Sequence, residues 1–374
     1  MILRSVTGAP LLALALIAGC AFGPEQRAIT ANMIPASDSA TAAPVQTLAE
    51  RQAFYGVPSV SITVVRNGAI AWSRGFGADR NPRMLFQAAS LSRSVAAAGL
   101  LDFAARRGID PEAEIGPSLH SFELAKIRPA GVVVSLDGLL AHKLGAAPAG
   151  YPGYDMGNLV PTLAELLAGA PRANSPPLTF DPAKVGSFNY GGAGYELAEL
   201  WSEDVSGEPF GVWMERELLR PLHMNDSTFG EPRVPIAHGY WSADEEVEGG
   251  WRTYPEKAAT GLWTTSPDFA RFLIALMDAE SGRPSPLSSR AARMMTARTS
   301  PNYGLGVSLQ TADPERIWFS NGGNAGYKTF YAAFPDRRDA IVILTNGEGG
   351  YPLTQEILAS ASKHYGWPSL TNAR

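Results

Sequence analysis

The sequence contains almost no cysteine, since Cys20 is the only one among 374 residues. A single thiol cannot form a disulfide within the chain, so the fold must be stable without one. Apolar residues make up 45% of the chain, and at this length they can form a large core. We therefore expect an ordered protein with one large domain or two closely joined ones.

Charged residues are also scarce, at 18% of the chain, and no run of lysine or arginine occurs. The formal net charge is −5, whereas nucleic-acid-binding surfaces are basic, so we expect no nucleic-acid partner. The five histidines show no metal-ligand spacing, and the sequence contains no His-Glu-x-x-His motif. We predict neither a metal site nor a cofactor.

Long hydrophobic runs are missing as well. Residues 10–18 form an apolar run after Arg4, but this run is too short to span a bilayer as a helix of the mature protein. It is typical of an export signal. Residues 17–20 read Ile-Ala-Gly-Cys, which resembles the lipobox of bacterial lipoproteins, where cleavage precedes a cysteine that is then lipidated. The alternative is an ordinary signal peptide that is cut at small residues further on.

We favour the lipobox because the only thiol of the chain falls within it. Residues 1–20 are then a lipoprotein-type signal peptide, and a lipid on Cys20 anchors the exported protein to a membrane, facing the periplasm or the cell exterior. Residues 21–46 are rich in Ala, Pro, Ser, Thr and Gln, and they are predicted to be a flexible tether. The folded domain is predicted to cover residues 47–374.

Strand patterns occur near both ends of this domain. Residues 59–65 are β-branched and apolar, Asn67-Gly68 is a strong hairpin signal, and residues 69–77 continue as a second strand. Further strand-like runs are residues 303–310, 316–320, 327–334 and 340–345, and helices are predicted at residues 267–279 and 352–365. Residues 109–260 are mostly helical in pattern. We predict an α+β fold, with one antiparallel sheet built from both chain ends, flanked by helices, and a mostly helical insert.

Residues 86–93, which read Phe-Gln-Ala-Ala-Ser-Leu-Ser-Arg, lead into a long apolar segment that ends at Gly108. Ser90 stands at the start of this predicted helix, where unpaired backbone N–H groups and the helix dipole favour negative charge. Arg93 follows three residues later, so both side chains share one helix face. Ser90 is therefore either a nucleophile or simply a helix cap, which is the commoner role of a serine at a helix start.

Further motifs follow these residues in a fixed order. They are residues 139–142 (Leu-Leu-Ala-His), 188–195 (Phe-Asn-Tyr-Gly-Gly-Ala-Gly-Tyr), 207–210, 220–229, 261–270, 303–306 and 344–347. Their order and spacing resemble the serine beta-lactamase and penicillin-binding-protein-like hydrolases, closest to the class C beta-lactamase and esterase branch, over residues 47–367. The resemblance implies the beta-lactamase/transpeptidase-like form of the predicted fold.

The resemblance also implies a catalytic apparatus. Ser90 would be the nucleophile that forms an acyl-enzyme, and Tyr190 would be the tyrosine that the helical region contributes. The backbone N–H groups of Ser90 and Asn324 would hold the oxyanion. The implied oxyanion and substrate-binding residues are Ser90, Asn321, Gly322, Gly323 and Asn324. By the same resemblance His142 would hydrogen-bond to backbone, and Trp263 would border the cleft.

Three positions depart from the family pattern, with Arg93 for a lysine, Asn321 for a histidine or lysine, and Gly192 for an asparagine. Arginine has a pKa above about 12 and does not lose its proton in proteins, so Arg93 cannot be the base. A permanent cation beside Tyr190 would favour the phenolate form of that tyrosine. The predicted catalytic residues are therefore Ser90 as nucleophile, Tyr190 as base and Arg93 as the supporting cation.

The other two departures bear on the substrate. Gly192 has no side chain to hold an acylamide group, and Asn321 has no positive charge for a substrate carboxylate. Both changes disfavour beta-lactam antibiotics and peptidoglycan peptides, so we predict a small-molecule ester or amide, with an esterase favoured over a beta-lactamase. The alternative is a catalytically inactive relative that serves as a binding or scaffold protein of the cell envelope.

Overall fold

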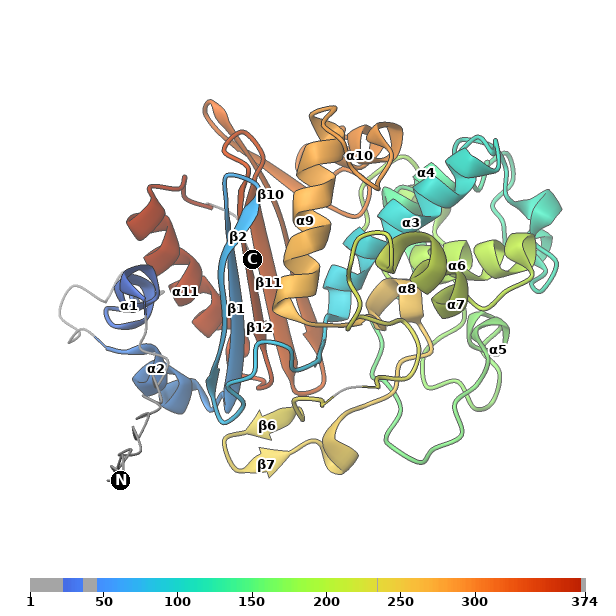
Figure 1. Ribbon diagram of the computed structural model, residues 1–374. Helices are drawn as coiled ribbons and strands as arrows, with labels where there is room; N and C mark the ends of the chain where they lie inside the picture. The colour runs from blue at the N-terminus through green and yellow to red at the C-terminus, as the bar shows by residue number, and fades with distance from the viewer. Residues whose placement is uncertain (1–22, 36–45, 234, 371–374) are drawn as a thin grey trace, which may run out of the picture.

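A six-stranded antiparallel sheet forms the centre of the molecule (Figure 1). The structure is a computed structural model that describes residues 23–35, 46–233 and 235–370. The strand order is β2-β1-β12-β11-β10-β9, with β1 (Ser59–Arg66), β2 (Ala69–Gly77), β9 (Ser308–Ala312), β10 (Glu315–Asn324), β11 (Tyr327–Phe334) and β12 (Asp339–Thr345). Because β1 pairs with β12, the sheet joins the two ends of the domain, which confirms the predicted α+β architecture.

Helices cover both faces of this sheet (Figure 1). One face carries α1 (Pro24–Thr30), α2 (Leu48–Tyr55) and α11 (Gly350–Tyr365), and the other carries α3 (Ser92–Arg106), α9 (Ser266–Glu280) and α10 (Ser289–Thr296). Side chains alternate between these two layers along β12. Ile341 and Ile343 belong to the core on the α11 side, whereas Val342 and Leu344 belong to the core on the α3 side.

In the region between the two halves of the sheet, helices joined by long loops make up most of the regular structure, in keeping with the predicted helical insert. Its helices are η3 (Gly116–Ser118), η4 (Leu124–Lys126), α4 (Leu136–Leu140), α5 (Leu163–Leu167), η5 (Pro182–Lys184), α6 (Ala193–Ser206), α7 (Phe210–Met214), η6 (Glu215–Leu219), η7 (Glu248–Gly250) and α8 (Lys257–Thr260). It also contains two small antiparallel pairs, β4 (Ala146–Ala147) with β5 (Thr179–Phe180), and β6 (Tyr240–Ser242) with β7 (Glu245–Glu246). The long helix α6 packs against α3, so the insert meets the sheet domain beside the helix that follows Ser90.

The prediction of a flexible tether over residues 21–46 does not hold for residues 23–35. These residues contain α1, which packs against α11, and both Ile29 and Met33 are buried in the core on that face of the sheet. Met33 also forms an isolated bridge with Gln46. The segment therefore docks on the apolar face of α11 through these two side chains, and hydrogen bonds from the Ile34 N–H to Ser360 and from Tyr365 to Glu25 add to the contact.

The predicted signal peptide at residues 1–20, including Cys20, lies outside the described residues. Within residues 23–35, 46–233 and 235–370, no helix has both the length and the apolar character needed to cross a membrane.

Candidate active site

Ser90 lies on a sharp turn between a short strand and a helix. β3 (Phe86–Gln87) pairs with β8 (Trp263–Thr264), and the Ala88 N–H donates to the Leu262 carbonyl at 2.8 Å. Ala89 has φ 51°, a value that is uncommon for a residue with a side chain. The turn continues as the 3₁₀-helix η2 (Ala89–Leu91) into α3. Ser90 is thereby partly exposed between buried neighbours, at the N-terminal end of the helix.

Arg93 is buried behind Ser90 and points to Tyr190. Its side chain is only 3% exposed, its Nη1 donates a hydrogen bond to the Tyr190 hydroxyl, and its Cζ lies 4.6 Å from the centroid of the Tyr190 ring. The Tyr195 ring lies on it as well, at 5.9 Å. Among the described residues, no carboxylate is within ion-pair distance of Arg93, and its Nε has no hydrogen-bond partner. Tyr190 is therefore the principal polar partner of a buried cation.

His142 packs against the Tyr190 ring and bonds to the backbone on both sides of Tyr190. The Asn189 N–H donates to the His142 carbonyl at 2.8 Å, the Gly191 N–H donates to His142 Nδ1 at 3.4 Å, and the two ring centroids lie 4.8 Å apart. Burial, with a smaller contribution from the charge of Arg93, holds the pKa of His142 well below its usual value. The ring is therefore neutral and can accept at Nδ1. This confirms the predicted structural role of His142, while Tyr190 itself remains 41% exposed.

The end of β10 passes directly beside the Ser90 turn. β9 pairs with β10 only as far as Phe319, so residues 320–324 have an open edge on that side. A Cβ atom on Gly322 would lie 2.9 Å from the Ser90 nitrogen and 2.6 Å from the Ala88 oxygen. Only glycine permits this close approach. The Thr329 hydroxyl of β11 also donates to the Ala88 carbonyl at 2.8 Å, which ties the sheet to the turn.

The side chain of Asn321 does not face Ser90. Its Nδ2 donates to the Tyr351 hydroxyl of α11 at 3.3 Å, on the opposite face of the sheet from Gly322. Since side chains alternate along a strand, Ser320 shares the face of Gly322. The position that we assigned to Asn321, at the head of the third motif, is therefore occupied by Ser320.

The backbone of β10 also differs from the expected arrangement. Asn324 pairs with Tyr327 across the two-residue turn Ala325-Gly326, and the closing pair of such a hairpin exchanges backbone hydrogen bonds. The Asn324 N–H is therefore expected to point to β11, and the N–H groups of Asn321 and Gly323 to point to the open edge. The Asn324 side chain is buried, and it binds Gln87 at 2.8 Å and Thr260 at 2.6 Å.

The structure thus gathers Ser90, Arg93, Tyr190 and the edge of β10 in one place, but the two hydroxyls are not bonded to each other. Within the described residues, the Ser90 hydroxyl has no hydrogen-bond partner. Catalytic hydrogen bonds often form only when substrate binds, so a missing bond between the two hydroxyls is compatible with a nucleophile and its base. The same residues include no group of three or more His, Cys, Asp or Glu side chains placed to hold a metal.

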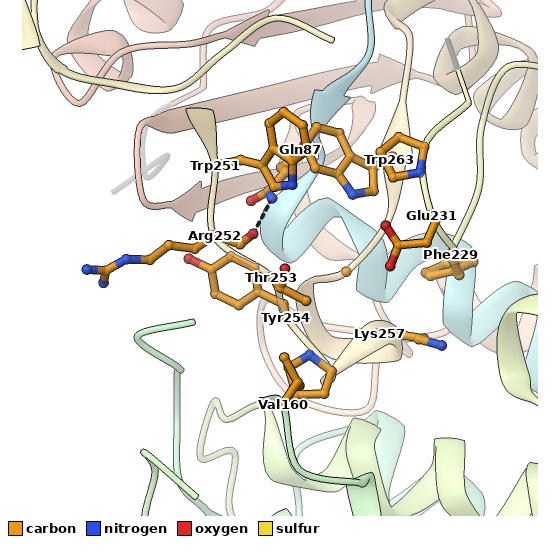
Figure 2. A pocket seen from close by; sticks show the side chains of 14 residues that line it. Gln87, Val160, Phe229, Glu231, Trp251, Arg252, Thr253, Tyr254, Lys257 and Trp263 are labelled. Carbon is orange, nitrogen blue, oxygen red and sulfur yellow. Dashed lines mark hydrogen bonds between the residues drawn. The ribbon is translucent and has the colours of Figure 1, made fainter. Parts of the chain in front are cut away.

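A cavity of about 460 Å³ adjoins this site (Figure 2). Its walls carry the aromatic side chains of Phe229, Trp251, Tyr254 and Trp263. Neither Ser90, Arg93 nor Tyr190 lines it. Trp263 was expected to border the cleft. Phe229, Trp251 and Tyr254 come from loops, and the sequence pattern does not specify how these loops fold.

Gln87 connects this cavity to the candidate site. Its Nε2 donates to the Arg252 carbonyl at 2.7 Å (Figure 2). Its Oε1 accepts from Asn324 Nδ2 at 2.8 Å. The Tyr254 hydroxyl accepts from the Ala325 N–H at 3.1 Å. Gln87 is only three residues before Ser90, a separation of at most about 11 Å along an extended chain. The cavity therefore lies within reach of a group attached to a substrate at Ser90.

Buried carboxyl groups form a second unusual feature near α6. Glu196, Glu199 and Glu256 are at most 2% exposed, and burial is the first cause that raises the pKa of each. For Glu256 the pKa rises to about 7, and neither carboxyl oxygen has a hydrogen-bond partner among the described residues. A charge on Glu256 would therefore be buried without compensation.

Replacing Glu256 by glutamine is expected to stabilise the protein at pH 8. The folded state holds a proton on Glu256 up to about pH 7, whereas the unfolded chain releases it near 4.5, so stability falls as the pH rises between these values. At about 1.4 kcal/mol per pKa unit, the cost above pH 7 is roughly 3 kcal/mol. Glutamine cannot acquire this charge. Thermal unfolding should show a higher Tm for Glu256→Gln at pH 8 and a much smaller difference at pH 4.5, whereas equal Tm values at pH 8 would contradict the assignment.

The central sheet, the helical insert and the serine on a strand-to-helix turn define the beta-lactamase/transpeptidase-like fold, which is a fold of serine hydrolases. The chain belongs to the Beta-lactamase family, whose family model matches residues 45–361. It is 24% identical over 297 residues to a Bacillus subtilis (strain 168) protein named as a penicillin-binding protein, PbpX, a match that covers 75% of this chain and 68% of that one.

Solved structures show the same fold. The octameric penicillin-binding protein homologue from Pyrococcus abyssi aligns with a TM-score of 0.69 and 22% identity, over 85% of this chain and 76% of that one. The D-amino acid amidase from Ochrobactrum anthropi SV3 aligns with a TM-score of 0.68 and 18% identity, over 85% and 98%. A D-stereospecific amidohydrolase from Streptomyces sp. aligns with a TM-score of 0.62 and 21% identity, over 82% and 94%.

Proposed function

We propose that this protein is an exported serine hydrolase that forms an acyl-enzyme at Ser90 with a small ester or amide. The observation that carries the proposal is a hydrogen bond from the buried Arg93 guanidinium to the hydroxyl of the partly exposed Tyr190. Arg93 lies one helical turn after Ser90. A buried cation whose hydrogen bond goes to a phenol, beside a serine at a helix start, is suited to acid–base catalysis.

In the proposed acylation step, Tyr190 takes the proton of the Ser90 hydroxyl as Ser90 Oγ bonds to the carbonyl carbon of the substrate. The Arg93 guanidinium donates from Nη1 to the Tyr190 oxygen and holds it in place, and its positive charge stabilises the negative charge that the reacting groups carry during this transfer. The proton then passes to the leaving alcohol or amine when its bond to the carbonyl carbon breaks. In a second step a water molecule gives a proton to the same tyrosine as its oxygen bonds to the acyl carbon, and the tyrosine returns this proton to Ser90 Oγ when the bond between Oγ and the acyl carbon breaks and the acid is released.

The proposed oxyanion site consists of two backbone N–H groups, from Ser90 and from Gly323. The resemblance had suggested Asn324 as the second donor, but the register of the β10–β11 hairpin favours Gly323. Gly322 supports this arrangement, because its missing side chain lets β10 approach the Ser90 nitrogen closely. Two donors fixed by the backbone stabilise the charge that develops on the carbonyl oxygen.

The residues around the site favour a neutral substrate, and we propose that esters react better than beta-lactams. Ser320, which takes the place expected for Asn321, is also uncharged, so this strand position offers no cation to a substrate carboxylate. The nearby cation Lys328 pairs with Glu348 at 2.6 Å. The aromatic walls of the adjoining cavity can receive an apolar substituent of the substrate.

Labelling of purified protein with a fluorophosphonate, together with hydrolysis of p-nitrophenyl acetate, tests the proposal. Both reactions require a nucleophile, an oxyanion site and a base, but no specific recognition of the substrate. Labelling at Ser90 with ester turnover would support the hydrolase. If wild-type protein shows neither, the alternative of an inactive binding or scaffold protein of the envelope is favoured instead.

We also propose that the mature protein is anchored to a membrane through a lipid on Cys20. The support is the pattern of residues 1–20, an apolar run after Arg4 that ends in Ile-Ala-Gly-Cys. Mass spectrometry of the mature N-terminus tests this proposal. A diacylglyceryl-modified cysteine would support it, and an unmodified N-terminus beyond residue 20 would contradict it.

A further inference from the structure

The space beside Gly192 is filled by a tyrosine from another part of the chain. A Cβ atom on residue 192 would lie 2.4 Å from Tyr151 Cε2 and 2.5 Å from the Tyr151 hydroxyl oxygen. No side chain other than hydrogen fits at this distance. Gly192 therefore allows the Tyr151 ring to occupy the volume into which any other residue at position 192 would extend.

Tyr151 reaches this position because the backbone just before it bonds to the residues that follow Tyr190. The Gly192 N–H donates to the Pro148 carbonyl at 3.2 Å and to the Ala149 carbonyl at 3.0 Å, and the Ala193 N–H donates to Pro148 at 3.2 Å. These bonds fix residues 148–151 against the start of α6. Tyr190 is only two residues before Gly192, at most about 7 Å along the chain, so the Tyr151 ring packs close to the backbone that carries Tyr190.

The hydroxyl of Tyr151 does not hold the ring in place. Its oxygen is buried, and it has no hydrogen-bond partner among the described residues. Leaving a buried hydroxyl unpaired costs about 1–3 kcal/mol, so this oxygen is not what makes the arrangement stable. The ring is instead placed by packing, since Tyr151 is partly buried against the main core. The Tyr151 ring therefore acts at this position through the volume that it fills.

We propose that Tyr151 sets an upper size limit on the acyl group of the substrate. The ring occupies the space beside Gly192, so a small acyl group can bind at Ser90. An acyl group that carries an amide substituent at its α-carbon would collide with the ring. This inference rests on the proposed hydrolase activity and adds the class of substrate to it, namely esters and amides of small, unbranched acyl groups.

Two esters with the same leaving group test the inference. p-Nitrophenyl acetate has a small acyl group, and p-nitrophenyl hippurate carries a benzoylamide arm at the same carbon. Wild-type protein should strongly prefer the acetate in kcat/KM. Tyr151→Ala should raise the ratio of hippurate to acetate by about tenfold or more, because a deleted ring opens space for the arm. The double variant Tyr151→Ala/Gly192→Asn should raise it at least as far, because the new amide can bond to the arm.

Tyr151→Phe is the matched control, because it removes the hydroxyl and keeps the ring. Its ratio should equal that of the wild type, and a ratio as high as that of Tyr151→Ala would overturn the size-limit argument. Tyr151→Leu provides an intermediate volume in case the alanine variant does not fold, and fluorophosphonate labelling reports folding of each variant. An unchanged ratio in Tyr151→Ala and Tyr151→Leu, with acetate still hydrolysed, contradicts the inference alone. Absence of acetate hydrolysis in wild-type protein contradicts the proposed function itself.

Discussion

Ser90→Ala is expected to abolish fluorophosphonate labelling and to lower the rate of p-nitrophenyl acetate hydrolysis at least about a thousandfold. The hydroxyl is the only atom of this residue that can form the acyl bond, and removing it leaves the base and the oxyanion donors without a nucleophile. Because Ser90 is partly exposed and its hydroxyl has no hydrogen-bond partner among the described residues, the fold should lose little stability. An unchanged Tm would exclude unfolding as the cause of lost activity.

Ser242→Ala is the matched control for this change. Ser242 is an exposed serine at the end of β6, away from the Ser90 turn, and its replacement should leave labelling and turnover at the wild-type level. If Ser90→Ala protein were labelled as fast as wild-type protein, the nucleophile would be another residue.

Tyr190→Phe is expected to lower kcat about a hundredfold to ten-thousandfold, the range of general acid–base catalysis, with little change in KM. The phenylalanine ring can still pack on Arg93 and His142, but it offers no oxygen to take the Ser90 proton. The Arg93 Nη1 group would also lose its hydrogen-bond acceptor. Steady-state kinetics with p-nitrophenyl acetate would separate the two parameters.

Tyr351→Phe supplies the comparison for the tyrosine. It removes a hydroxyl that bonds to Asn321 on the α11 face of the sheet, so kcat should stay within about threefold of the wild type. A fall in kcat for Tyr190→Phe that is no larger than for Tyr351→Phe would rule out Tyr190 as the base.

The sheet could be predicted from the sequence because its signals are local. Asn67-Gly68 between two apolar runs predicted the β1–β2 hairpin, and both residues adopt positive φ, 52° and 79°, as the favoured hairpin turn requires. β11 and β12 are composed mainly of apolar and aromatic residues, so the residue types alone predict them as strands. The segment around Ser90 was likewise identified from its own residues and from its resemblance to a known motif.

The face to which each β10 residue points could not be predicted in the same way. Adjacent side chains on a strand point to opposite faces, so an error of one residue in the register exchanges Asn321 for Ser320 at the site. The sequence Ser-Asn-Gly-Gly-Asn contains no alternation of apolar and polar residues that would fix the register. The partners of β10 in the sheet decide it, and these come from elsewhere in the chain.

Tyr151 illustrates a second limit of prediction from sequence. In the sequence, Gly192 is only a position that lacks the asparagine of the family pattern. The structure shows that the space beside Gly192 is occupied by Tyr151, which lies 41 positions earlier in the chain. The docking of α1 on α11 has the same origin, because it depends on an apolar surface about 330 residues further on. Contacts between distant segments carry no local pattern.

The measurement that tests the central claim most directly is the rate of Ser90 acylation by p-nitrophenyl acetate at pH 7 in wild-type protein and in Arg93→Met. Methionine keeps much of the volume of the buried arm, but it removes the positive charge and the hydrogen bond to the Tyr190 hydroxyl. If the Arg93 guanidinium supports Tyr190 as the base, the variant should be acylated about a hundredfold more slowly than the wild type. Equal acylation rates would contradict the account, because the cation would then have no part in the activation of Ser90.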